Sequence, residues 1–289
     1  MLFVDRFPPP DAKTPVLRRE RHCGGLTATA LVAAQRLGAR CAYAGVLGRD
    51  ELSTFAIQAL AAEGIDLSRL RQNESARPLN SMIVVDQARQ TRNIFVDFNG
   101  VVGAAPDWPP DEVVQGCRVL FVDYIGVPGM LRAAGLARAA GIPVVADIEA
   151  TDPQVARLME QVDHLILSWE FAGGLTYAAT PDKAALALWQ AGRQAVVITC
   201  GDQGAWYVAA GDPGRAIHQP AYPVAVVDTN GCGDVFHGAY AAALVRGLDI
   251  ADRISFASAA AALKATRAGG QAGAPRLAEV EQFLKERNA

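Results

Sequence analysis

Five short apolar runs, separated by stretches of helical composition, constrain the fold of this chain more than any other feature. Runs this uniformly apolar are typical of parallel strands that are buried on both faces. Stretches such as PGMLRAAGLARAAG and PDKAALALWQAGR lie between them and predict helices that cover the sheet. The alternation predicts a doubly wound α/β fold with a mostly parallel sheet. The runs are CAYAGV, VLFVDYI, IPVVADI, HLILS and AVVITC, at residues 41–46, 119–125, 142–148, 164–168 and 195–200.

Two segments depart from this alternation. Residues 1–23 contain LFVDRF, a Pro-Pro-Pro turn and PVLRRERH, and residues 79–98 contain two strand-like runs joined by the polar loop DQARQ. Neither has a helical pattern, and their half-polar alternation suits a small exposed sheet. We interpret them as a lid over the mouth of the main sheet, or else as a pair of edge hairpins. The whole chain, 1–289, is then one α/β domain with a small appendage.

Composition and charge argue against several partners. The net charge of -3 provides no basic face for a phosphate backbone, so we expect no nucleic-acid partner. No apolar run reaches the ~20 residues that span a bilayer, and the N-terminus MLFVDRFPPPD lacks the order of a signal peptide. We therefore expect a cytoplasmic protein with no membrane partner. The five cysteines show no C-x-x-C spacing, which argues against a zinc site or a disulfide framework.

The stretch VVDTNGCGDVFHGAYAAAL, at residues 226–244, carries the strongest chemical signal. A metal loop, a helix cap or a plain turn could each contain such a glycine run. In an open parallel sheet, however, ligands sit where glycine turns lead into helix N-termini. Gly231 and Gly233 allow close approach to exposed N–H groups, and the following helix adds its positive dipole end. We therefore predict an anion-binding turn at residues 231–234.

Asp234 could be either a helix cap or a catalytic residue. A carboxylate in the first turn of a helix is commonly no more than a cap. In an anion-binding turn, however, a carboxylate repels the ligand that the amides attract, so its presence requires a chemical reason. A general base that takes the proton from an alcohol attacking a phosphoryl group supplies that reason.

Residues 228–234, DTNGCGD, resemble the D-T-x-G-A-G-D signature of the ribokinase-type (PfkB) carbohydrate kinases, with Cys232 in place of the usual alanine. Residues 23–50 resemble the family's glycine hinge, helix and strand, and residues 196–208 resemble the strands that line the nucleotide site. Residues 256–275 resemble the closing helix and loop around the adenine. The resemblance covers essentially the whole chain. It implies a ribokinase-like three-layer α/β/α sandwich with a mostly parallel central sheet and a small β-sheet lid.

The resemblance also implies the reaction, which is ATP-dependent phosphorylation of a hydroxyl of a ketose or related monosaccharide. Asp234 would be the general base, and Gly231, Cys232 and Gly233 would form the anion hole. ATP would bring Mg²⁺, and K⁺ would bind near Asp228 and the 268–273 loop. The expected partners are the sugar, ATP and a second copy of the chain, paired through the lid. The implied nucleotide-binding residues are Thr199, Gly201, Gly204, Asp228, Thr229, Ala261 and Gly270, and the implied substrate-binding residues are Lys13, Gly24, Gly25, Thr29, Asp97 and Asp234.

Three departures from the family pattern weaken parts of this reading. Relatives begin with a strand and a sugar-binding aspartate ahead of the part that resembles LFVDRFPPPDAK. Either the protein lacks this central strand and substrate ligand, or its true start lies upstream of Met1, which is the alternative we favour. Thr29 stands where the family has an asparagine that contacts the sugar. The magnesium element N-x-x-E appears as Ser168-Trp169-Glu170-Phe171, in which Glu170 is one position out of register.

The sequence is therefore compatible with more than one substrate and with more than one activity. Parts of the chain resemble sulfofructose kinases, and Lys13 could face the 6-anion of such a ketose. The Asp123-Tyr124-Ile125 region has no arginine to clamp a sulfonate, so a neutral ketohexose or pentose is at least as well supported. A noncatalytic sugar- or nucleotide-binding homologue, and a kinase of a nucleoside or vitamin-like alcohol, are the alternatives. His237, one helical turn past Asp234, fits either a structural role or electrostatic modulation of Asp234, and Asp97 and Asn99 fit either the sugar pocket or a turn.

Overall fold

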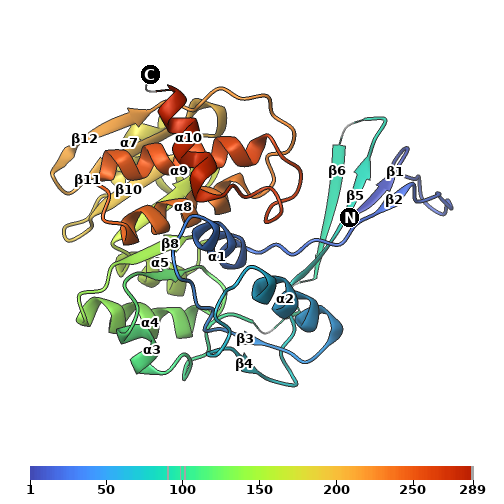
Figure 1. Cartoon of the computed structure of the whole chain (residues 1–289), viewed down its shortest axis with the longest axis horizontal. Coiled ribbons are helices and arrows are strands. Elements are labelled where there is room, and N and C mark those ends of the chain that lie inside the picture. The colour runs from blue at the N-terminus through green and yellow to red at the C-terminus, as the bar shows by residue number, and fades with distance from the viewer. Residues whose placement is uncertain (90, 98, 101, 288–289) are drawn as a thin grey trace.

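The fold was analysed in a computed structural model that describes residues 1–89, 91–97, 99–100 and 102–287. Residues 90 and 98 of the predicted lid segment lie outside this description, as do residue 101 and residues 288–289 of the predicted domain. A six-stranded sheet in the order β12-β11-β10-β9-β8-β7 forms the centre of the body (Figure 1). Its four strands from β7 to β10 are parallel, and a hairpin adds β11 and β12 in antiparallel orientation. The strands are β7 (Leu120–Val122), β8 (Val144–Asp147), β9 (His164–Ser168), β10 (Ala195–Thr199), β11 (Ala205–Ala209) and β12 (Asp212–Gln219).

Helices cover both faces of this sheet because successive side chains of each strand point to opposite faces. Ile166 of β9 packs into one hydrophobic cluster, while its neighbours Leu165 and Leu167 pack into the other. The first cluster lies under α1 (Leu26–Arg36), α8 (Cys232–Val245), α9 (Ile250–Ala265) and α10 (Leu277–Arg287). The second lies under α3 (Asp111–Gln115), α4 (Val127–Ala139), α5 (Pro153–Glu160), α6 (Trp169–Thr176) and α7 (Pro181–Ala187).

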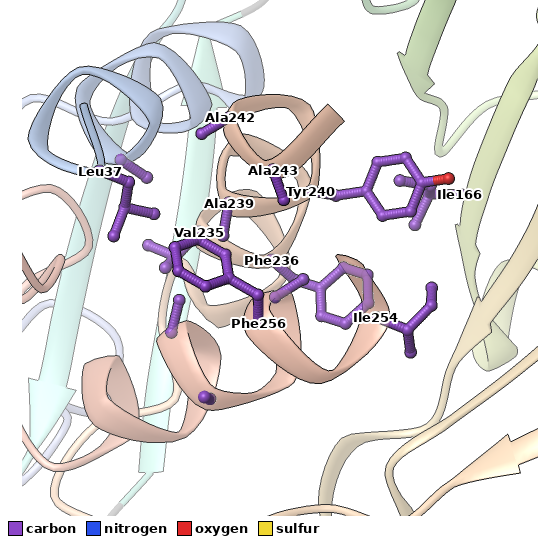
Figure 2. Close-up of a cluster of buried hydrophobic side chains, with 14 of the residues drawn as sticks. Leu37, Ile166, Val235, Phe236, Ala239, Tyr240, Ala242, Ala243, Ile254 and Phe256 are labelled. Carbon is purple, nitrogen blue, oxygen red and sulfur yellow. The ribbon is translucent and has the colours of Figure 1, made fainter. Parts of the chain in front are cut away.

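The small residues of α8 let this helix pack in the middle of its layer. Figure 2 shows the cluster in which side chains of α8 and α9, among them Phe236 and Ile254, meet beside the sheet. Gly238 brings α8 close to α1, since a Cβ at this position would lie 2.2 Å from the carbonyl oxygen of Ala30. The small-residue sequence after the glycine turn therefore places the helix N-terminus firmly against the body.

The two segments without helical pattern contribute four strands to a separate small sheet in the order β2-β1-β5-β6. It stands to one side of the body, joined to it by extended connections (Figure 1). The predicted fold class, a three-layer α/β/α sandwich with a small β-sheet lid, is confirmed. The strands of the lid are β1 (Leu2–Val4), β2 (Arg18–Arg19), β5 (Asn80–Asp86) and β6 (Thr91–Asp97).

Residues 41–46 do not form the predicted strand of the main sheet. Within this run, Ala42 makes only an isolated bridge to Asp66, and a short parallel pair follows, formed by β3 (Val46–Leu47) and β4 (Arg71–Gln72). The six-stranded sheet ends at β7, and both β7 and residues 41–45 line the large cleft described below. The run pairs instead with residues 66–71, since Cys41 and Tyr43 exchange backbone hydrogen bonds with Asp66, and it does not join the main sheet. The remaining helix is α2 (Glu51–Ala62), and no helix in the described part of the chain is long and apolar enough to cross a membrane.

Candidate active site

The glycine turn leads from Asp228 into α8, as predicted. Gly231 caps the helix in the left-handed region with φ of +79°, where glycine is favoured. A Cβ at this position would lie 2.8 Å from the Cα of Gly270, so the turn and the loop after α9 touch through backbone alone. The N–H groups of Gly233 and Asp234 have no acceptor among the described residues, whereas that of Cys232 donates to the carbonyl of Thr229 at 3.2 Å. Free N–H groups at a helix N-terminus are suited to binding an anion.

Asp234 lies beside these free N–H groups in the first turn of α8 and lines the cleft. Burial and the charge of Asp147 together raise the pKa of Asp234 to about 7, against the opposing charge of His237. The hydroxyl of Thr29 also favours the ionised form of Asp234, although Thr29 Oγ1 is buried and has no well-formed hydrogen bond in the described part of the protein. A carboxyl group with a pKa near neutral pH has the properties of a general base.

His237 lies one helical turn further along α8 and is buried against the sheet. Its Nδ1 is 2.8 Å from the carbonyl oxygen of Gly233 and 3.4 Å from a carboxylate oxygen of Asp147, and its Nε2 is 3.1 Å from the carbonyl oxygen of Ile166. All of these neighbours are acceptors, so both ring nitrogens carry protons. Burial alone would lower the pKa of His237, but Asp147 and the two carbonyl groups outweigh it and raise the pKa. A buried imidazolium therefore lies behind the turn.

Acidic side chains gather at the same edge of the sheet. Asp147 ends β8, and burial raises the pKa of its carboxyl group. Burial also raises the pKa of Glu149, and the negative charges of Asp147 and Glu170 add to that shift. Glu170, the predicted magnesium residue, is exposed in the first turn of α6. Among the described residues, no three His, Cys, Asp or Glu side chains are grouped so that they could hold a metal ion.

The predicted nucleotide-binding residues lie on two sides of the turn. Thr199, Gly201 and Gly204 follow one another at the carboxyl end of β10, and Gly204 is confined to glycine because a Cβ would lie 2.1 Å from the carbonyl oxygen of Gln219. On the other side, Gly270 contacts the turn, and Ala261 lies on α9. Asp228 and Thr229 form the start of the turn itself, where the carboxylate of Asp228 accepts hydrogen bonds from the N–H groups of Asn230 and Gly269.

A large cleft, of about 2680 Å³, separates the lid from the body. Gly24 and Gly25 lie on its wall directly before α1, and Gly25 has a φ of +94°. Thr27 donates from Oγ1 to the buried carboxylate of Asp123 at 2.6 Å, and burial raises the pKa of Asp123 to about 6. The lining thus brings together the glycine hinge, Thr29 and Asp234, as well as Asp123, which was not predicted as a site residue. It combines residues of the lid and the body: Ile83, Ile94, Thr29, Asn230, Gly231 and Asp234.

Two predicted substrate residues lie outside the lining of this cleft. Lys13 is exposed in the connection between β1 and β2, near the outer end of the lid. Asp97 shares a face of β6 with Phe95, while Val96 on the opposite face lines the cleft. The Asp97 carboxylate accepts hydrogen bonds from the backbone and side chain of Asn99, which lower its pKa. That arrangement matches the turn alternative for Asp97 and Asn99.

Arg36 and Gln271 connect the loop after α9 to α1 and to the glycine hinge. Arg36 of α1 forms a bidentate pair with Glu63, with nitrogen–oxygen distances of 2.8 and 2.6 Å. The same guanidinium donates to the carbonyl groups of Gln271 and Ala274 at 2.9 and 2.7 Å. The side chain of Gln271 in turn donates to the carbonyl group of Gly24 at 3.4 Å.

Two residues important to this site were missed in the sequence, whereas His237 was singled out there. Asp147 was visible only as the polar end of an apolar run. Lys264 is a single cation in the otherwise apolar stretch AAAALKA, and its side chain is completely buried. The available signal for each was a charged residue in a stretch that otherwise predicts the core.

An α/β/α body with a β lid, an anion-binding helix terminus and an aspartate beside it defines the class of ribokinase-fold kinases that phosphorylate small molecules. Residues 2–277 match the model of the pfkB family carbohydrate kinase. The chain therefore belongs to the pfkB family. It is an ATP-dependent carbohydrate kinase, that is, a phosphotransferase with an alcohol group as acceptor.

Similar proteins agree with this assignment over nearly the whole chain. The ribokinase of Bacillus subtilis is 30% identical over 272 residues, which cover 90% of this chain and 87% of that protein. The structure of a candidate ribokinase from Agrobacterium tumefaciens has a TM-score of 0.89 at 28% identity and covers 99% of this chain and 94% of that chain. An Arabidopsis thaliana ribokinase complexed with ribose and ATP shares the fold, with a TM-score of 0.87 at 23% identity over 98% of this chain and 94% of that chain.

The contacts of His237 predict that two buried histidines of this protein differ in charge. Burial, with the charge of Arg253, lowers the pKa of His164 to about 3, so its ring stays neutral at neutral pH, whereas His237 keeps both protons. Nitrogen NMR of the imidazole rings in the labelled protein measures both states. In Asp147→Asn, the pKa of His237 should fall because the neighbouring negative charge is gone. A neutral His237 ring at neutral pH in the unmodified protein would contradict the imidazolium.

Proposed function

We propose that this kinase phosphorylates a hydroxyl of a neutral monosaccharide, a ketose or related sugar, with Asp234 as general base. The observation that carries the proposal is the position of the Asp234 carboxyl, beside free N–H groups at the start of α8 and on the wall of the cleft. A carboxylate there weakens anion binding, so its presence supports a catalytic role. The reaction with ATP fits the cytoplasmic location predicted from the sequence.

In this mechanism, Asp234 accepts the proton of the sugar hydroxyl as the hydroxyl oxygen attacks the terminal phosphorus of ATP. The bond from that phosphorus to the bridging oxygen breaks, and ADP leaves with the bond's electrons. The N–H groups of Gly233 and Asp234 lie at the N-terminus of α8, where they stabilise the charge on the transferring phosphoryl group. The Cys232 thiol has no step in the reaction, since burial raises its pKa.

The His237–Asp147 pair supports this base from behind. The imidazolium lowers the pKa of Asp234 and so opposes the effect of burial. It also accepts no hydrogen bond, and its Nδ1–H fixes the carbonyl group of Gly233 in the first turn of α8. We infer that His237 keeps Asp234 ionised often enough to act near neutral pH and holds the turn in its anion-binding shape.

The acidic edge of the sheet fits a magnesium ion that arrives with ATP. Mg²⁺ commonly binds through phosphates, waters and one or two carboxylates, so a complete protein cage is not needed. Glu170 is the residue that would hold its waters, and the bound ion would neutralise phosphate charge. This agrees with the absence of a metal-holding group among the described residues.

The wall of the cleft next to Asp234 supports a sugar as acceptor. Thr29 is buried there, and its hydroxyl has no well-formed hydrogen bond among the described residues; such a buried hydroxyl is costly unless a ligand supplies a partner. We infer that Thr29 binds a sugar hydroxyl and that Gly24 and Gly25 allow the lid to close over it. Lys13 lies outside the cleft lining and so gives no support for a sugar with a 6-anion, although Arg18, Arg21 and Arg92 line the cleft.

An assay of ADP release with a panel of ketohexoses, aldopentoses, their 6-phospho and 6-sulfo forms, and nucleosides tests this function. We expect a neutral sugar to stimulate ADP release. Asp234→Asn should lose turnover by about 10²-fold or more, since general bases contribute about 10²–10⁴-fold, while ATP binding stays intact or improves. Asp212→Asn, at the exposed start of β12, is the matched control and should keep its activity.

Two outcomes would count against the proposal. Full turnover in Asp234→Asn would remove the assigned base while leaving the carbohydrate kinase activity in place. Stimulation by nucleosides alone would move the acceptor to another class of alcohol.

The pKa of Asp234 predicts how activity depends on pH. Because the ionised carboxylate is the active form and its pKa is raised to about 7, kcat/KM for the sugar should rise with pH through about 7 and then level off. Glu149→Gln should move this rise to lower pH, since the charge of Glu149 is one cause of the raised pKa. Measurement of kcat/KM across the pH range for both proteins checks the sign, and a flat profile would argue against Asp234 as the base.

We also propose that two lids pair in a homodimer. Met82 and Phe95 are cross-strand neighbours on the lid face that points away from the cleft, and they are 56% and 55% exposed. Exposed apolar neighbours of this kind mark interaction surfaces. Light scattering during size-exclusion chromatography should report a dimer for the native chain and a monomer for Phe95→Ser. A monomeric native protein at micromolar concentration would contradict this proposal.

A further inference from the structure

The side chain of Lys264 ends next to the glycine turn instead of reaching solvent. It comes from the last turn of α9, and its exposed fraction is 0%. The aliphatic stem passes Gly273, where a Cβ would lie 2.8 Å from Cδ of Lys264. A buried lysine is uncommon and needs compensating partners.

The partners of this ammonium group are the oxygens of two separate segments. Nζ donates to the carbonyl oxygen of Asp228 at 2.8 Å and to that of Arg267 at 3.1 Å, and it lies 3.9 Å from a carboxylate oxygen of Asp228. That same carboxylate oxygen accepts the N–H of Gly269 at 2.8 Å. One positive charge thus joins the turn before α8 to the loop after α9.

This place is where a K⁺ ion was expected, near Asp228 and the 268–273 loop. A monovalent cation would be held by carbonyl oxygens and a carboxylate, the groups that Lys264 already contacts. An ammonium group carries the same charge as K⁺ and is of similar size. The residues present therefore do not fit a bound K⁺, because two cations cannot share these oxygens at contact distance.

We propose that Lys264 serves as a built-in monovalent cation for this site, so that turnover does not depend on K⁺. The inference rests on the proposed function, since it concerns the turn that holds Asp234. Lys264 is a positioning residue: it neutralises Asp228 and fixes the loop whose Gly270 contacts Gly231. The charge that other proteins recruit from solution is here part of the chain.

The first experiment compares wild-type turnover of the stimulating sugar in chloride salts of K⁺, Na⁺ and tetramethylammonium at equal ionic strength. We expect the same kcat in all three, because tetramethylammonium is too large for the site and the ammonium of Lys264 already fills it. Stimulation by K⁺ of about fivefold or more, the lower end of typical coupling between sites, would overturn the proposal.

The second experiment removes the built-in cation. In tetramethylammonium, Lys264→Ala should have a lower kcat, and K⁺ or methylammonium should restore it with saturation. The same ions should raise the unfolding temperature of Lys264→Ala above its value in tetramethylammonium, because they bind only the folded variant. The matched control, Lys285→Ala on the exposed face of α10, should respond to no cation.

These readouts separate the failure of the inference from the failure of the proposed function. If no sugar is phosphorylated by the wild type, the function fails, and the unfolding temperatures still report whether Lys264→Ala acquires a cation site. If Lys264→Ala responds to neither ion in turnover or unfolding temperature, the built-in cation is wrong even though the kinase stands. If this variant does not fold, the wild-type comparison alone decides.

Discussion

The carboxylate of Asp228 organises the turn on which the active site depends. Its two oxygens accept hydrogen bonds from the N–H groups of Asn230 and Gly269, and the ammonium of Lys264 lies close by. With these contacts, the backbone at Gly231 lies against Gly270, and the N–H groups of Gly233 and Asp234 have no acceptor among the described residues. These N–H groups can bind an anion only while the turn keeps its shape. The proposed anion hole therefore depends on Asp228, although Asp228 contributes no N–H group to it.

Burial then gives each charge in this region a distinct state. The acceptors around His237 raise its pKa, while burial beside Arg253 lowers the pKa of His164 to about 3. Asp234 lies between these influences, with burial and Asp147 raising its pKa and His237 lowering it. The same low-dielectric surroundings that disfavour isolated charge thus allow one carboxyl group to exchange its proton near neutral pH. The sheet contributes by holding two acceptors, the carboxylate of Asp147 and the carbonyl group of Ile166, at fixed distances from His237.

Local patterns predicted much of the fold and the centre of the site. Strands β7 to β10, the glycine turn and α8 follow from apolar runs, from glycine and from small residues, which act over a few positions. Where a side chain points depends on contacts with residues far away in the sequence. Asp97 faces away from the cleft because of the alternation along β6, and residues 41–46 lack a hydrogen-bonded neighbour in the main sheet. The role of Lys264 was not predicted for the same reason. Of its two carbonyl partners, only that of Arg267 is local, at 3 residues, whereas that of Asp228 is 36 residues away.

The contacts of Arg36 connect the two ends of the cleft mechanically. Its guanidinium holds carbonyl groups of the loop after α9 and, through Glu63, the end of α2, while Gln271 of that loop contacts the carbonyl group of Gly24. The hinge of the lid and the loop next to the anion hole therefore belong to one stiff unit. A movement of the lid at Gly24 would therefore act on the loop after α9 through the hydrogen bond from Gln271.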